Sequence, residues 1–381
     1  MFMKPVFLVA AFLFITFSST AQLVDENFEF EGVVRNHKVF VPANYSDNMP
    51  LVLNLHGYTS NAFQQVFYSN MNAVAEQNDF VVVFPDGTTD QNGITFWNSE
   101  ILGESVNDLG YLEALIDSMI ENYSIDPNRV YMCGMSNGGF MSYYSACELS
   151  SKIAAIASVT GTMNNAIYDN CNPERAVPVL EIHGTSDATV PYNGASSTGS
   201  FQSMMPIEEV VDFWVNHNNC TLESEQELED ISTSDMSTVT HFKYTGGDNG
   251  SSVEHYRIND GGHTWPGSII PLPSTNHDII ASEVIWDFFK QYTLDGLLEV
   301  DEFSIVKSFD IMPNPMLNYT RIKSANKIES LGIYDLQGKR VFSSSVNAYE
   351  YTLDREMLSS GVYIVEAETE TQSIYQKLFV Q

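Results

Sequence analysis

The sequence predicts an α/β fold with a mostly parallel sheet that helices cover on both faces, followed by a small all-β sandwich domain. Two observations support the first part. Strand-like runs alternate with helical patterns, and these runs are apolar throughout, as a sheet buried on both faces requires. The third observation is a change after Tyr292, where helical patterns give way to short strand-like runs separated by turns.

The elements expected in the first domain follow from these patterns. In the segment 108–122, Leu112, Leu115 and Met119 recur at helical spacing, whereas FVVVFPDG is a short apolar run that ends in turn residues. On the same grounds we expect strands at 28–42, 50–57, 80–87, 129–134, 153–161, 178–184, 238–245 and 252–258, and helices at 62–77, 108–122, 137–148, 206–217 and 277–291.

The first 21 residues have the pattern of a secretory signal peptide. Lys4 precedes an apolar run, and small residues end the segment at Ala21, so we expect cleavage before Gln22 and a secreted or cell-surface protein. No later run reaches the roughly 18 apolar residues of a membrane helix, so we expect no stable membrane span in the mature chain.

A second boundary follows the last predicted helix. We place the first domain at 22–292, a linker at 293–304 and the all-β domain at 305–381, in which DLQG and SSG are hairpin-grade turn signals.

Charge and cysteine content limit the partners. The formal net charge of −32 argues against nucleic acid, whose phosphates require clustered Lys and Arg, and favours a solvated acidic surface. The four cysteines are not spaced like a zinc site. Cys133 lies in an apolar run and is expected to be a buried thiol, while Cys147, Cys171 and Cys220 compete for one disulfide.

Ser136 has the sequence surroundings of a nucleophile. It lies at the centre of Gly134-Met135-Ser136-Asn137-Gly138, a G-x-S-x-G motif between a predicted strand and a predicted helix. Small residues are needed there because the tight turn that raises the serine Oγ above the sheet edge leaves no room for a nearby Cβ. The following helix N-terminus favours developing negative charge.

A serine nucleophile needs a base and an acid that orients the base. In α/β-hydrolases these follow the serine in the order acid then histidine, each on a loop after a strand. Asp187 comes just after the strand at 178–184, and His263 lies on a Gly-rich loop between the last strand and the last helix. Asp86 and Asp260 compete with Asp187, but neither follows the expected strand.

The other histidines lack such a loop. We expect His183, which ends a strand before the acid loop, only to help position that loop. The rest are expected to be surface or strand residues: His37, His217, His241, His255 and His277.

The oxyanion of acyl transfer also needs donors. One is expected to be the backbone N–H of Asn137, after the nucleophile, and the second the N–H of Tyr58, in the loop after the strand LVLNL. Thr59 is a less favoured substitute as donor. The alternative is that His56-Gly57 merely turns the chain.

Seven stretches occur in a fixed order: HGYTSN, FPDG, WNSE, VNDLGYLEALID, IDPNRVYMCGMSNGGFMS, VPVLEIHGTSDATVPYNG and GGHTWPG. They resemble the secreted esterase family that includes polyhydroxybutyrate depolymerases and feruloyl esterases of carbohydrate esterase family 1. The resemblance covers roughly residues 30–291 and implies an α/β-hydrolase fold in which Ser136, Asp187 and His263 form the catalytic triad.

The same resemblance implies that Trp97 and Trp265 line the acyl end of the cleft, and we expect Thr59 to contact substrate. Where the family often has a pair of aspartates this chain has Asn107-Asp108, so no role is carried over to the first position.

The tail resembles a different family. FDIMPNPMLN, IESLGIYDLQGKRV, LSSGVYIVEAET and QKLFVQ are similar to the C-terminal sorting domain of the type IX secretion system, over residues 305–381. This implies the type IX secretion machinery as a partner. A polysaccharide-binding module is the alternative, although the tail has few aromatic residues for stacking on sugars.

The expected function is that of a secreted serine carboxylic-ester hydrolase that releases feruloyl or related acyl groups from polysaccharide, with no cofactor and no metal. A polyester depolymerase of the polyhydroxybutyrate type is the alternative enzyme. The alternative of another class is a surface binding module that kept the fold without activity, whose sign would be a missing triad residue.

Overall fold

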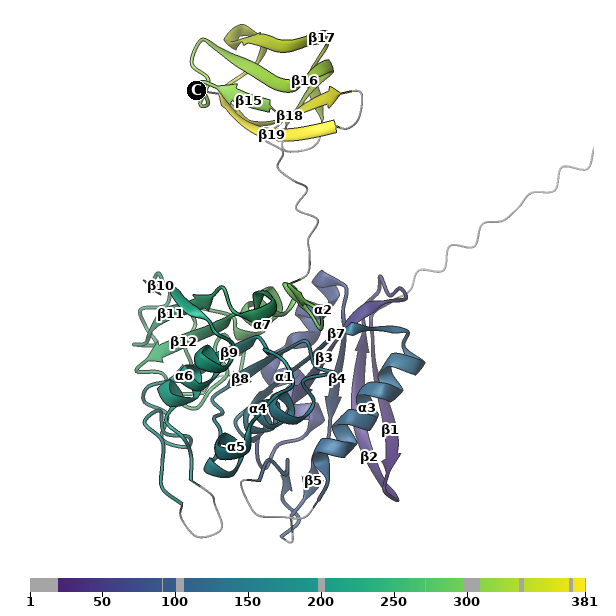
Figure 1. Ribbon diagram of the computed structural model, residues 1–381, viewed down its shortest axis with the longest axis vertical. Helices are drawn as coiled ribbons and strands as arrows, with labels where there is room; N and C mark the ends of the chain where they lie inside the picture. The colour runs from purple at the N-terminus through teal and green to yellow at the C-terminus, as the bar shows by residue number, and fades with distance from the viewer. Residues whose placement is uncertain are drawn as a thin grey trace, which may run out of the picture. The chain divides into compact units, whose positions relative to one another are not determined.

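The computed structural model describes residues 20–90, 92–100, 106–197, 203–270, 272–297, 309–335, 339–369 and 373–380. The predicted signal peptide and most of the predicted linker therefore lie outside the described residues. The chain divides into two compact units, Met1–Leu298 and Glu299–Gln381, and each is described by itself (Figure 1).

The first unit is built on one ten-stranded sheet. Its middle strands β4, β3, β7, β8, β9 and β12 are parallel, and antiparallel strands extend both edges. Along the sheet the order is β1 (Gln22–Phe30), β2 (Val33–Val41), β4 (Val81–Pro85), β3 (Met49–Leu55), β7 (Ile125–Met135), β8 (Ala155–Val159), β9 (Val179–Gly184), β12 (Val253–Asn259), β11 (Thr238–Thr245) and β10 (Thr221–Glu227).

Helices cover both faces of this sheet, as predicted (Figure 1). Alternate residues of a strand face opposite layers, so that Leu51 and Leu53 of β3 pack in one core and Val52 packs in the other. One core contains residues of α3 (Asp108–Asn122), α4 (Asn137–Glu148), α5 (Asn165–Asn170) and α6 (Ile207–His217), and the other contains residues of α1 (Ala62–Ser69), α2 (Met71–Asn78) and α7 (Ala281–Phe289).

Several elements differ in detail from those expected. The strand expected at 28–42 is part of a hairpin, in which β1 and β2 pair antiparallel and the chain turns at Glu31 and Gly32. The helix expected at 62–77 is two helices, because Asn70 takes a left-handed backbone with φ of 51° between them. The helix expected at 277–291 begins only at Ala281. Strand β10 was not expected, since TLESEQE is polar and fully exposed; it pairs only with β11 at the edge of the sheet.

A short hairpin ends the first unit. It consists of β13 (Tyr292–Thr293) and β14 (Gly296–Leu297) and continues into the segment predicted as linker. The Tyr131 hydroxyl donates to the Tyr292 carbonyl at 2.6 Å, and the Leu294 N–H donates to the Asn128 carbonyl at 3.0 Å. The first part of the predicted linker therefore belongs structurally to the first unit.

The second unit is all-β, as predicted, with strands β15 (Phe309–Met312), β16 (Tyr319–Tyr334), β17 (Arg340–Asp354), β18 (Gly361–Thr369) and β19 (Ser373–Val380). These described strands are connected by hydrogen bonds into one antiparallel sheet. The long β16 pairs along one edge with β15 and then β18, and along the other with β17. Its own core includes Ile322, Leu331 and Leu378.

The structure also answers the open cysteine question. Cys147 at the end of α4 is bonded to Cys171 after α5, whereas Cys133 and Cys220 are buried thiols. Among the described helices none is long and apolar enough to cross a membrane.

Candidate active site

Ser136 lies at the bend between β7 and α4, with a φ of 53° and a ψ of −118°. This backbone region is rarely taken by a residue with a side chain, and it is typical of a nucleophile held on a tight turn. A Cβ added to Gly134 would lie 2.5 Å from the Gly138 backbone, and one added to Gly138 would lie 2.5 Å from the Leu55 carbonyl oxygen. Both glycines are therefore required by close backbone packing.

The other two candidate residues lie at the same edge of the sheet. Strands β7, β9 and β12 run parallel, so their carboxyl ends meet at one edge. Ser136 follows β7 directly, Asp187 comes shortly after β9, and His263 comes shortly after β12. This is the position in which open α/β sheets carry their ligand sites.

Asp187 and His263 form a hydrogen-bonded pair. His263 Nδ1 lies 2.7 Å from Asp187 Oδ2, and the other carboxylate oxygen accepts from the N–H groups of Thr189 and Val190 at 2.8 and 2.9 Å. Burial alone would raise the pKa of Asp187, but hydrogen bonds from His183 and His263 outweigh it and hold that pKa well below its usual range. An ionised Asp187 accepts from Nδ1–H, which leaves His263 Nε2 as the basic nitrogen.

The loops that carry the two residues are bonded to each other. Thr185 N–H donates to the Ile258 carbonyl and Ser186 N–H donates to the Gly261 carbonyl, both at 2.9 Å. A Cβ on Gly184 would lie 2.3 Å from the Gly261 oxygen, so only glycine permits this approach. The acid and the base are thus held together by backbone contacts at their strand ends.

The two competing aspartates, Asp86 and Asp260, make other contacts. Asp86 Oδ1 accepts from the Ala62 N–H at 2.6 Å, at the start of α1. The backbone of Asp260 is held by the hydroxyl of Thr185 at 2.9 Å. Of the three candidates considered, Asp187 is the one bonded to His263.

The loop after β3 approaches the nucleophile. A Cβ on Gly57 would lie 3.5 Å from Ser136 Cβ. The Thr59 N–H already donates to the Thr95 carbonyl at 2.9 Å, which argues against it as an oxyanion donor and leaves Tyr58 as the candidate in this loop. The Thr59 side chain is exposed and stays a candidate substrate contact.

His56 fixes this loop from the inside, so its role goes beyond turning the chain. Its Nε2 accepts from the Gly87 N–H at 2.9 Å, and its Nδ1 therefore carries the proton and donates to the Gly57 carbonyl at 2.7 Å. Burial lowers the pKa of His56 to about 4, so the ring is neutral at physiological pH.

Comparison with known proteins identifies the family of the chain. Residues 36–234, more than half of the chain, match the phospholipase/carboxylesterase family. The chain belongs to this family. Residues 310–381 match the secretion system C-terminal sorting domain, which confirms the expected sorting domain and directs the protein to the cell surface or the exterior.

This chain has relatives that are named as esterases. It is 28% identical over 70% of its length to a bifunctional acetylxylan esterase/xylanase of Neocallimastix patriciarum, and 28% identical over 64% of its length to feruloyl esterase B of Piromyces equi. It spans 34% and 42% of those two relatives. Among solved structures, the acetyl xylan esterase of Aspergillus awamori is 16% identical, with a TM-score of 0.49 over 71% of this chain and 98% of that one.

The expectation that two tryptophans line the cleft is wrong for this structure. Trp97 and Trp265 are 0% and 1% exposed, so neither ring presents a face to a substrate. Their indole N–H groups donate to the His56 carbonyl at 3.0 Å and to the Ser282 hydroxyl at 3.2 Å. Both rings thus support the site from within.

The departure at Asn107-Asp108 also has a structural account. Asn107 caps α3 by accepting from the Gly110 N–H at 2.9 Å, a task that suits an asparagine as well as an aspartate. Asp108 is buried and binds both Arg35 Nη1 at 2.5 Å and the Asn98 N–H at 2.6 Å. It therefore anchors the segment that contains Trp97.

Two features of the site could not be read from the sequence. One is the use of the Asn137 side chain, and the other is the buried pair of Glu181 and His183 behind Asp187. Among the described residues no group of three or more His, Cys, Asp and Glu side chains is arranged to hold a metal ion.

Proposed function

We propose that this protein is a secreted serine esterase that releases feruloyl or related acyl groups from polysaccharide. The observation that carries the proposal is the 2.7 Å contact between His263 and Asp187, at the sheet edge where Ser136 lies on its strained turn. The relatives named as acetylxylan and feruloyl esterases support the substrate class.

The proposed reaction has two steps. Ser136 Oγ attacks the ester carbonyl carbon while its proton passes to His263 Nε2, and the N–H groups of Asn137 and Tyr58 stabilise the oxyanion. When the tetrahedral intermediate collapses, His263 gives the proton to the leaving alcohol and the acyl group stays on Ser136. Water then attacks the acyl-enzyme with the same histidine as base, and the carboxylic acid leaves.

Variants of the three residues test this reaction. Ser136→Ala and His263→Ala should each lower kcat by about 10⁶-fold with the fold intact, and Asp187→Asn by about 10⁴-fold. Asp260→Asn is the matched control, since it changes a carboxylate three positions before His263, whereas the carboxylate bonded to the ring is that of Asp187. A larger loss in Asp260→Asn than in Asp187→Asn would overturn the choice of acid.

Feruloyl, acetyl and 3-hydroxybutyryl esters of one alcohol, compared by kcat/KM, test the substrate. Highest kcat/KM on feruloyl and acetyl esters supports the proposal. A folded wild-type protein without turnover on any of the three would favour the inactive binding module. A fluorophosphonate probe that labels wild type but not Ser136→Ala would contradict that alternative.

A polyester depolymerase is the second candidate, and exposed apolar side chains favour it. Ile269 is 72% and Leu272 43% exposed in the loop after His263, and Phe63 on α1 is 56% exposed. The Ser268 hydroxyl donates to the Tyr68 carbonyl at 2.9 Å, which joins this loop to α1. This candidate would be favoured if the enzyme released monomer from a 3-hydroxybutyrate polymer film faster than it released ferulate from feruloylated xylan. Ile269→Ser should then lower the activity on the film and leave the activity on xylan unchanged.

A further inference from the structure

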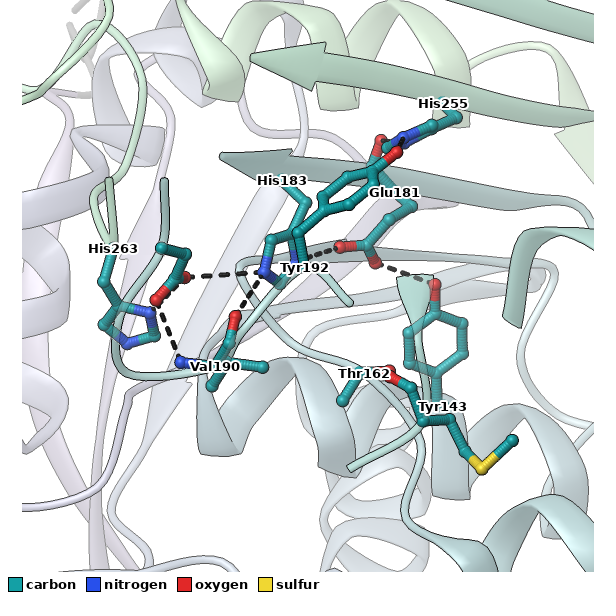
Figure 2. A network of polar contacts seen from close by, with 10 residues as sticks. Tyr143, Thr162, Glu181, His183, Val190, Tyr192, His255 and His263 are labelled. Atoms are coloured by element: carbon teal, nitrogen blue, oxygen red, sulfur yellow. Dashed lines mark hydrogen bonds and ion pairs between the residues drawn. The ribbon is translucent and has the colours of Figure 1, made fainter. Parts of the chain in front are cut away.

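A chain of polar contacts continues inward from Asp187 (Figure 2). Figure 2 shows the rings of His263 and His183 on either side of one carboxylate, which the contacts identify as that of Asp187. His183 Nε2 lies 3.4 Å from Asp187 Oδ2, and His183 Nδ1 lies 2.9 Å from Glu181 Oε1. The Tyr143 hydroxyl donates to the other oxygen of Glu181 at 2.7 Å and ends the chain.

The partners of His183 favour a proton on each ring nitrogen. Nδ1 faces the carboxylate of Glu181, while Nε2 faces Asp187 and also the Val190 carbonyl oxygen at 2.9 Å. Carbonyl and ionised carboxylate oxygens accept and do not donate, so beside an ionised Glu181 a neutral ring would leave one nitrogen lone pair against an oxygen. Burial raises the pKa of Glu181, and hydrogen bonds from His183 and Tyr143 oppose that shift. With Glu181 ionised, the ring is an imidazolium between two carboxylates.

The charges of this site agree with that assignment. Burial alone would lower the pKa of His183, but hydrogen bonds to Asp187 and Glu181 outweigh it and raise the pKa to about 9. Both side chains of the His183–Glu181 pair are completely buried. An unpaired charge in such a place would be costly, whereas a paired one is held in a single geometry.

The other titratable groups around His183 include one further cation, Arg257, which is its register partner on β12. The ring of Tyr192 meets it edge-on, with ring centroids 6.0 Å apart. On β12, burial lowers the pKa of His255 to about 3, so this histidine is neutral, and Arg257 bonds the Asn259 side chain at 3.1 Å. His263 contacts the other side of Asp187, and Tyr143 on α4 bonds Glu181.

We propose that His183 is a positioning residue of the esterase, a buried imidazolium that holds the Asp187 carboxylate from the interior while His263 binds it from the outer side. Glu181 is the counter-ion that keeps His183 charged. This role rests on the proposed function, since it acts on the acid of the proposed triad.

The charge has a consequence for His263. A carboxylate beside an imidazole stabilises the protonated ring, and a cation on the other side of that carboxylate reduces the effect. Loss of the cation is therefore expected to move the acidic limb of the pH–rate profile to higher pH. The cation also restricts Asp187 to one orientation, and misplacement of a catalytic group by about 1 Å can lower the rate by about 100-fold.

The first test is His183→Gln, which retains an amide N–H for Asp187 and removes the charge. We expect kcat for 4-nitrophenyl acetate to fall by about 10- to 100-fold with KM little changed, and the acidic limb of the kcat/KM profile to move up by about one pH unit. Tyr192→Phe is the matched control: it keeps a buried ring against His183 and removes only the hydroxyl bonded to His255 at 2.9 Å. It should leave the acidic limb in place. The proposal would be overturned if the acidic limb of the kcat/KM profile stayed in place in His183→Gln, or if it moved equally in Tyr192→Phe.

The second test does not depend on turnover or on a folded His183 variant. In ¹⁵N NMR of the wild-type protein, both ring nitrogens of His183 should stay protonated above pH 8, and in Glu181→Gln the ring should lose its proton at lower pH. A neutral His183 ring at pH 7 in the wild type would overturn the proposal. A charged His183 in a protein that hydrolyses no ester would instead overturn the proposed function alone.

Discussion

The side chain of Asn137 and the backbone of Trp97 form a reciprocal pair of hydrogen bonds. Trp97 N–H donates to Asn137 Oδ1 at 2.6 Å, and Asn137 Nδ2 donates back to the Trp97 carbonyl at 2.9 Å. The Trp97 indole also donates to the His56 carbonyl at 3.0 Å. One buried segment therefore connects the residue after the nucleophile with the loop that carries the second proposed oxyanion donor.

Asn137→Ala should reduce both stability and turnover. It removes the Asn137 partners of a buried N–H and a buried C=O of Trp97, which costs about 1–3 kcal/mol of unfolding free energy. The backbone N–H proposed to bind the oxyanion is kept, but it loses the side-chain anchor to Trp97 that positions it, so kcat should fall by about 10- to 100-fold. Urea unfolding and steady-state kinetics measure the two effects.

Asn164→Ala is the matched control for Asn137→Ala. Asn164 is also a buried asparagine, and its Nδ2 donates to the Ser99 carbonyl at 2.8 Å in the same segment. We expect a similar loss of stability without the loss in kcat. Equal losses of kcat in the two variants would show that Asn137 acts only through general stability.

Arg35→Leu should strongly destabilise the first unit. Arg35 and Asp108 form a buried ion pair, and the guanidinium lies 3.8 Å from the ring centroid of Tyr111. Removal of one partner leaves Asp108 as a buried charge without its cation, which costs about 3–5 kcal/mol. Chemical denaturation measures the change.

The exposed ion pair of Lys152 and Asp117 provides the comparison for Arg35→Leu. Its side chains are 31% and 60% exposed, so Lys152→Ala should cost no more than about 1 kcal/mol. Similar losses of unfolding free energy in Arg35→Leu and Lys152→Ala would contradict the importance that we assign to burial.

Part of the site could be predicted because its signals are local. The glycines around Ser136 lie within a few residues of it, and the positions of Asp187 and His263 depend only on which strand each follows. The role of Glu181 could not be predicted in this way. The sequence places it only within an apolar strand, and a carboxylate in a completely buried strand is explained by its partners, His183 and Tyr143.

The positions of the two tryptophans could not be predicted from local signals. A tryptophan near a catalytic motif can face the substrate or the core, and the choice depends on contacts distant in sequence. Trp265 is separated from its partner Tyr68 by 197 positions, and Trp97 from Asn137 by 40. For the same reason the sequence does not determine the pairing of Cys147 with Cys171, which depends on the relative positions of α4 and α5.

Stability should fall at alkaline pH because of His183. Its pKa is raised to about 9 in the folded protein, whereas an unfolded histidine titrates near 6.5. A group whose folded pKa is raised contributes stability that is fully present below about pH 6.5 and is lost as the pH rises toward about 9. The difference in unfolding free energy between wild type and His183→Gln should therefore shrink from pH 6.5 to 9. A constant difference would contradict a charged His183.

The last prediction concerns the second unit, whose hydrophobic core contains only residues from Ile311 onward. The two cores of the first unit are formed by residues up to Leu294, and Ser136, Asp187 and His263 all precede that position. We therefore expect residues 22–298 to fold alone and to hydrolyse 4-nitrophenyl acetate with a kcat within about threefold of the mature chain, a barrier change below about 0.7 kcal/mol.

A cut before the hairpin is the matched control for this truncation. Ending the chain at residue 290 removes Tyr292, which is 2% exposed, accepts from the Tyr131 hydroxyl and bonds the Ser252 hydroxyl. That shorter chain should be less stable than 22–298, as measured by thermal unfolding.

In the native host, loss of the sorting domain should leave the first unit in the periplasm, because residues 310–381 carry the export signal. A truncated enzyme that still reaches the medium would contradict the sorting role. If the truncated enzyme kept full activity on soluble esters and lost activity only on insoluble polysaccharide, the second unit would be a binding module.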